Sequence, residues 1–139
     1  MHVLALDIGE KRCGIAVSDS SGKIAIPIST LDTQHVLGGH PDFKRILSDH
    51  EPELLLCGLP VSLDGAEHTQ AIRIRQQAEL ISQQTGLPLA FVDERLSSSE
   101  ARRLLRESGH TERSMRGKVD MVAASLILAT WLEAQRTIL

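Results

Sequence analysis

Three apolar segments within the first 30 residues constrain the fold more than any other feature of the chain. The segments HVLALDIG, CGIAVSD and KIAIPIST have the length and composition of β-strands, and only the short connections GEKR and SSG separate them. Connections this short join neighbouring antiparallel strands. We therefore predict an antiparallel meander, with Pro27 placing its third strand at a sheet edge or at a bulge.

Strands alternate with helices in the rest of the chain. Apolar spacing predicts helices over residues 41–50, 66–86, 97–109 and 118–136, and loops over 31–40 and 110–117. The apolar runs in EPELLLCGLP and LPLAFVDE are typical of buried strands. Strands linked through helices pair in parallel with right-handed crossovers. The fold class is therefore α/β, with a mixed five-stranded sheet flanked by helices.

Size and composition favour one soluble, cytoplasmic domain. The chain has 139 residues, of which 42% are hydrophobic, which is enough to form a hydrophobic core. We expect residues 1–139 to form a single domain. The first residues lack the pattern of a signal peptide, and no run reaches the roughly 18 apolar residues of a membrane helix. Cys13 and Cys57 lie in apolar runs without metal-ligand spacing, so we expect two buried, reduced thiols.

Positive charge gathers in one segment of a chain whose net charge is −3. Between Arg95 and Lys118 lie seven Lys or Arg residues and three Glu residues, a local net charge of +4, which leaves −7 for the remainder. Such asymmetry is typical of a phosphate-binding face. An ordinary solvated helix and loop would show the same pattern.

Carboxylates stand at the ends of the predicted elements. Asp7 ends the first strand, Asp93 and Glu94 end the last strand, and Asp120 lies on the apolar stripe of the final helix. Functional groups gather at the carboxyl ends of parallel strands, so we expect Asp7, Glu94 and Asp120 to converge there. Adjacent strand residues point to opposite faces, which makes Asp93 the structural member of its pair.

Converging carboxylates repel one another unless a cation lies between them. Mg²⁺ and Mn²⁺ prefer carboxylate oxygen, and two such ions can hold the attacking and leaving oxygens of a phosphodiester displacement. We therefore expect two ions, Mg²⁺ or Mn²⁺. Each acid also has a simpler explanation: Asp7 could cap a turn, Glu94 could pair with Arg95 or lie on the surface, and Asp120 could favour a helix N-terminus.

Four segments of the chain resemble the motifs of one known family. LALDIGEKRCGIAVSD, CGLPVSLDG, VDERLSSSEA and KVDMVAASLIL are similar, in order and spacing, to the motif blocks of the YqgF family, also called the RuvX or Holliday junction resolvase family. The resemblance implies a ribonuclease H-like fold and a metal-dependent nuclease, acting on Holliday junctions or on the 5′ end of pre-16S ribosomal RNA. It also implies that Asp7, Glu94 and Asp120 are the catalytic, metal-holding acids.

Basic residues near these acids are candidates for substrate binding. Lys11 and Arg12 lie on a tight turn after Asp7, and Lys118 lies two residues before Asp120. The loop 110–117 carries two further arginines. We expect phosphate contacts from the following residues, each of which could instead be a solvated surface cation: Lys11, Arg12, Arg95, Arg113, Arg116 and Lys118.

Three function classes remain open from the sequence. The first is a nuclease acting on an rRNA precursor, other RNA or branched DNA, as a monomer or a homodimer, since only symmetric junction resolution requires a dimer. The second is a catalytically inactive nucleic-acid adaptor, which the scarcity of aromatic residues disfavours. The third is an actin-like ATPase module, for which 139 residues are too few.

Overall fold

The strands form one five-stranded sheet in the order β3-β2-β1-β4-β5. A computed structural model describes residues 1–60, 68–93, 97–115 and 117–138. β2 pairs antiparallel with both β1 and β3, whereas β4 pairs parallel with β1 and β5 parallel with β4. The predicted mixed sheet is confirmed. The strands are β1 (Val3–Ile8), β2 (Arg12–Ser18), β3 (Ala25–Asp32), β4 (Leu54–Leu59) and β5 (Leu89–Asp93).

Six helices connect or follow these strands in the described residues. They are α1 (Thr33–Leu37), α2 (Pro41–His50), α3 (Thr69–Thr85), α4 (Ser97–Glu107), α5 (Glu112–Met115) and α6 (Val119–Ile138). The sequence predicted four of them. The loops expected over 31–40 and 110–117 are wrong, because these segments contain α1 and α5.

Tertiary contacts order both of the unforeseen helices. Thr33, the first residue of α1, donates its hydroxyl to the Gly9 carbonyl at 2.8 Å and its amide to the Lys11 carbonyl at 2.9 Å. In α5, Met115 is buried to 1% exposure. Helices of four or five residues are too short to show apolar periodicity, so a sequence pattern cannot reveal them.

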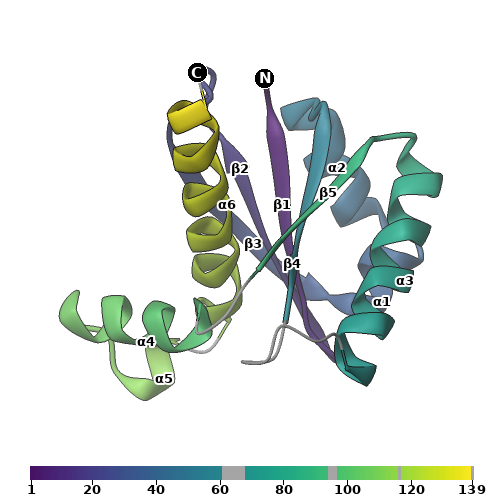
Figure 1. Ribbon diagram of the computed structural model, residues 1–139. Coiled ribbons are helices and arrows are strands. Elements are labelled where there is room, and N and C mark those ends of the chain that lie inside the picture. The colour runs from purple at the N-terminus through teal and green to yellow at the C-terminus, as the bar shows by residue number, and fades with distance from the viewer. Residues whose placement is uncertain (61–67, 94–96, 116, 139) are drawn as a thin grey trace.

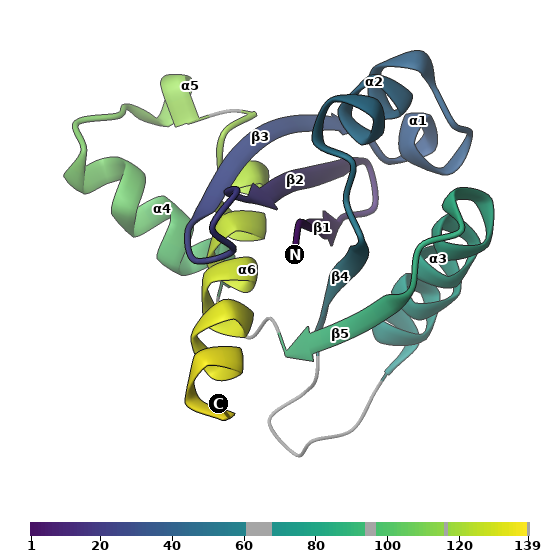
Figure 2. The same ribbon diagram turned by 90° about the horizontal axis from the view of Figure 1, so that it is seen from above.

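Helices cover both faces of the sheet. α6 packs on one face, while α1, α2 and α3 lie on the other, and α4 and α5 extend from the end of α6 where that helix begins (Figures 1 and 2). The α6 face is built from small and medium side chains, including Val3 and Ala5 of β1. The opposite face takes larger ones, including Leu4 and Leu6. This alternation along β1 places Asp7 on the α6 face.

Pro27 and the cysteines lie where the sequence predicted. β3 is an edge strand, and its pairing register with β2 shifts between Ile15 and Ala16, beside Pro27. Cys13 and Cys57 are buried and free. None of the described helices combines the length and the apolar character needed to cross a membrane.

Candidate active site

Gly14 brings the N-terminal end of α6 against the sheet beside Asp7. Asp7 of β1 pairs directly with Gly14 of β2. A Cβ atom added to Gly14 would lie 1.9 Å from the backbone oxygen of Asp120. No side chain fits in that space. Because glycine has none, α6 can begin directly against β2. Asp7 and the first turn of α6, which carries Asp120, therefore adjoin the same glycine on the α6 face of the sheet.

The carboxylate of Asp120 is half-buried, and one of its oxygens accepts no hydrogen bond. Its side chain is 22% exposed. Its Oδ2 atom is shielded from solvent and accepts no hydrogen bond. The Nε atom of Arg12 lies 3.1 Å from Oδ2, which makes an ion pair, but the N–H is not directed at the oxygen as a hydrogen bond requires. A buried carboxylate oxygen in this state suits a hard cation, whose binding has no need of a donor hydrogen.

The negative charges of Asp7 and Asp120 both reach the neighbouring thiol of Cys13. Burial raises the pKa of Cys13 well above its ordinary value, and the charges of Cys57, Asp7 and Asp120 raise it further, in that order of importance. Asp7 and Asp120 therefore both lie within electrostatic range of the same residue of β2. Their negative charges attract divalent cations.

The turn between β1 and β2 holds two cations at the entrance to this site. The Gly9 amide donates to the Arg12 carbonyl at 2.8 Å, and a Cβ on Gly9 would lie 2.6 Å from that oxygen. The contacts of Thr33 with the Gly9 and Lys11 carbonyls fasten the turn to α1. A pocket of about 630 Å³ opens here, lined by Gly9, Glu10, Lys11, Arg12, Asp32 and Asp120.

Only some of the remaining predicted site residues belong to the part of the chain that the structure describes. Glu94, Arg95 and Arg116 lie outside the described residues. Lys118 is half-buried and directly precedes α6, while Arg113 is exposed on α5. Among the described residues, no group of three His, Cys, Asp or Glu side chains is placed to hold a metal ion, so Asp7 and Asp120 form only part of the predicted ligand set.

Sequence reasoning missed two residues beside Asp120. Arg102 of α4 and Glu112 of α5 line a second polar pocket of about 290 Å³, which shares Arg12 and Asp120 with the first. It also missed the pairing of Arg12 with Asp120. No local pattern signals these contacts, because each joins elements that only the folded chain brings together.

Comparison with known proteins identifies the family. The family model for RuvX, described as Holliday junction resolvase, matches residues 1–134. The chain belongs to the RuvX family. Among its RuvX relatives, a protein of Thermosynechococcus vestitus named "Putative pre-16S rRNA nuclease" is 37% identical over 97% of this chain and 89% of its own length. A protein of Dechloromonas aromatica with the same name is 36% identical over 95% and 90%.

Solved structures show that this RuvX chain has the ribonuclease H-like resolvase fold. Thermus thermophilus RuvC is 15% identical, with a TM-score of 0.60, and the match covers 99% of this chain and 97% of RuvC. The fowlpox virus resolvase, solved with its substrate Holliday junction DNA, is 11% identical, with a TM-score of 0.61 and coverage of 97% and 99%.

Proposed function

We propose that this RuvX protein is a metal-dependent nuclease that hydrolyses phosphodiester bonds in structured nucleic acid. The observation that carries the proposal is the contact of α6 with Gly14, which places the half-buried acids Asp7 and Asp120 on one face beside the basic turn of Lys11 and Arg12. Paired acids beside cations fit a site that holds both a metal ion and a phosphate.

We assign the metal site to Asp7, Asp120 and Glu94, holding Mg²⁺ or Mn²⁺, with two ions as the expected number. Bound there, the ions would activate a water molecule for attack on phosphorus and stabilise the charge that develops on the phosphate oxygens. The Asp120 Oδ2 atom, buried without a hydrogen bond, fits this assignment. In this proposal the acids of the chain position the ions, and water rather than a side chain is the nucleophile.

Arg12 has two roles in this proposal. It contacts Asp120 at 3.1 Å and so compensates the acid's charge, yet its side chain is 58% exposed. An exposed guanidinium can exchange one anionic partner for another at little cost. Arg12 and Lys11 therefore guide a substrate phosphate toward Asp120. The further phosphate contacts that we assign come from Arg95, Arg113, Arg116 and Lys118.

We propose the 5′ end of pre-16S rRNA as the first substrate to test and the Holliday junction as the second, because the relatives' names and the family description point to these two. The protein would act in the cytoplasm as a monomer or a homodimer.

A cleavage screen tests the proposal. Purified protein is incubated with precursor rRNA, single-stranded RNA and a four-way DNA junction, in Mg²⁺ or Mn²⁺ and in chelator. We expect metal-dependent cleavage of at least one structured substrate. Binding without cleavage, unaffected by chelator, would instead show an inactive adaptor, and saturable ATP turnover without cleavage would show an ATPase module.

Two neighbouring acids at the end of β5 are expected to differ in effect. Asp93 shares its position in the strand alternation with Leu89 and Phe91, which pack on the face opposite α6 and away from Asp7. Asp93→Asn should therefore reduce cleavage only modestly, whereas Glu94→Gln should abolish it. Single-turnover cleavage by both variants checks this, and complete loss in both would reassign the metal-holding acid.

A further inference from the structure

The second pocket beside Asp120 gathers charged residues from three parts of the chain. Arg12 comes from β2, Arg102 from α4 and Glu112 from α5, and all three line the same polar space of about 290 Å³. The remaining lining residues are Met115, Gly117, Val119 and Asp120. Because Arg12 and Asp120 also line the first pocket, the two spaces meet at the proposed catalytic acid.

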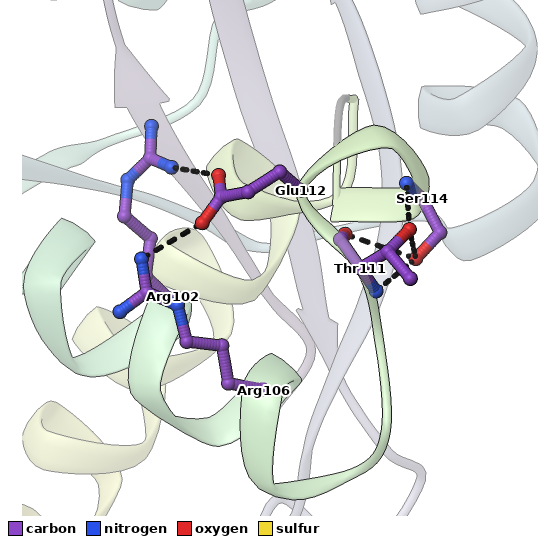
Figure 3. Close-up of polar contacts among 5 residues, drawn as sticks. All are labelled: Arg102, Arg106, Thr111, Glu112 and Ser114. Carbon is purple, nitrogen blue, oxygen red and sulfur yellow. Dashed lines mark hydrogen bonds and ion pairs between the residues drawn. The ribbon is translucent and has the colours of Figure 1, made fainter.

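Glu112 lies between two arginines of α4. Its carboxylate accepts a hydrogen bond from Arg106 at 2.9 Å and lies 3.6 Å from the Arg102 guanidinium (Figure 3). The Arg106 hydrogen bond, followed by the charges of Arg106 and Arg102, lowers the pKa of Glu112 and so favours its ionised form. The chain thus supplies its own anion to a pair of arginines.

The position of Glu112 is determined by the cap of its short helix. The Thr111 amide donates to the Ser114 hydroxyl oxygen at 2.9 Å, and the Ser114 amide donates to the Thr111 hydroxyl oxygen at 3.2 Å (Figure 3). This reciprocal cap and the buried Met115 hold α5 so that Glu112 faces α4. The capped and packed helix α5 therefore holds Glu112 next to the two arginines.

These ion pairs can be exchanged for contacts with another anion. The side chains of Arg102, Arg106 and Glu112 are between 48% and 67% exposed. Exposed pairs of this kind contribute little to stability because water screens them. A phosphate that approaches Arg102 therefore has to displace only a weakly held carboxylate.

We propose that this pocket is a second phosphate-binding site for the nucleic-acid backbone, in which Arg102 acts with Arg12 and Glu112 occupies the arginines until substrate displaces it. The inference rests on the proposed nuclease function. A strand that crosses Asp120 would have one phosphate beside the turn of Lys11 and Arg12 and another beside Arg102. Glu112 makes binding more selective, because a phosphate must displace its carboxylate before contacting the arginines.

Arg103 provides a matched control for Arg102. It lies next in the same helix, is similarly exposed, and pairs with Glu100 and with Glu107, the latter at 2.8 Å. It does not line the second pocket. Arg102→Ala and Arg103→Ala remove the same charge. A difference in affinity between the two variants therefore reflects where the arginine lies and not the net charge of the protein.

The experiment measures binding of a labelled four-way DNA junction and a labelled precursor rRNA in chelator, where cleavage is excluded, across about 50–200 mM salt. We expect Arg102→Ala to weaken binding about tenfold at low salt and to lower the salt slope by about 0.9 on duplex DNA. Arg103→Ala should change affinity by less than about twofold. Arg102→Gln, which keeps most of the side-chain stem, should repeat the loss.

Removal of the competing anion should have the opposite effect. Glu112→Gln is expected to tighten binding about two- to fivefold, the range that corresponds to an exposed ion pair. Its control, Glu107→Gln, removes an equal charge on the Arg103 side of α4 and should leave affinity nearly unchanged.

The outcomes separate this inference from the proposed function. Equal effects of Arg102→Ala and Arg103→Ala, or of the two glutamate variants, would overturn the second phosphate site while leaving the nuclease proposal intact. A wild-type protein that binds neither nucleic acid would overturn both.

Discussion

Asp120→Asn is expected to reduce cleavage about a thousandfold or more. The reason is that a metal-holding carboxylate contributes several kcal/mol to stabilising the transition state, and each 1.4 kcal/mol or so corresponds to a factor of ten. Asp7→Asn should have a similar effect, because Asp7 is assigned to the same metal site. Single-turnover cleavage of the substrate found in the screen, in excess Mn²⁺, measures the loss.

Thermal unfolding distinguishes a metal-holding Asp120 from a residue that only begins a helix. Added Mn²⁺ should raise the Tm of the wild type through mass action, and this rise should be lost in Asp120→Asn. Without metal, the free energy of unfolding of the variant should stay within about 1 kcal/mol of the wild-type value, because two small effects oppose each other. The variant loses the ion pair with the exposed Arg12, but it no longer buries a charged oxygen that accepts no hydrogen bond.

Asp49→Asn is the matched control for these measurements. Asp49 is exposed near the end of α2, and it lines neither of the two pockets at Asp120. It should keep both cleavage and the Mn²⁺-induced rise in Tm. If Asp120→Asn still cut at the wild-type rate and kept the full rise, Asp120 would have to be treated as an ordinary helix-start residue.

Gly14→Ala is expected to destabilise the protein by about 3 kcal/mol or more. The added methyl carbon would lie 1.9 Å from the Asp120 backbone oxygen, so α6 must move away from β2. Overpacking in well-packed interiors costs about 1–3 kcal/mol, and here the obstacle is backbone, which has no rotamer to adjust. Urea unfolding measures the loss, and cleavage should fall with it because Asp120 moves with its helix.

Gly109→Ala separates this steric effect from backbone conformation. Gly109 has φ of +89°, and nothing lies within 4 Å of the space that its Cβ would occupy. Its replacement should cost only about 1 kcal/mol, from the left-handed backbone alone. If Gly14→Ala cost no more than Gly109→Ala, the close contact of α6 with β2 would be wrong.

The arrangement of strands was readable from local features. Short connections dictate the antiparallel meander of β1, β2 and β3, and helical connections dictate the parallel pairing of β4 and β5. Pro27 predicted an edge or a bulge, and β3 is an edge strand whose register is irregular beside it. Short helices were the errors, since α1 and α5 depend on Thr33 bonding to a distant turn and on the burial of Met115.

The sequence by itself indicated the candidate acids: Asp7 at a strand end, Glu94 after the last strand and Asp120 on an apolar helix stripe. That Asp7 and the start of α6 adjoin the same glycine was decided by the tertiary structure, because strand register pairs Asp7 with Gly14 and α6 packs where Gly14 leaves room. The pairing of Arg12 with Asp120 and of Glu112 with two arginines was likewise decided there. Local patterns reflect the backbone preferences of neighbouring residues, whereas contacts between distant charges depend on how the elements pack.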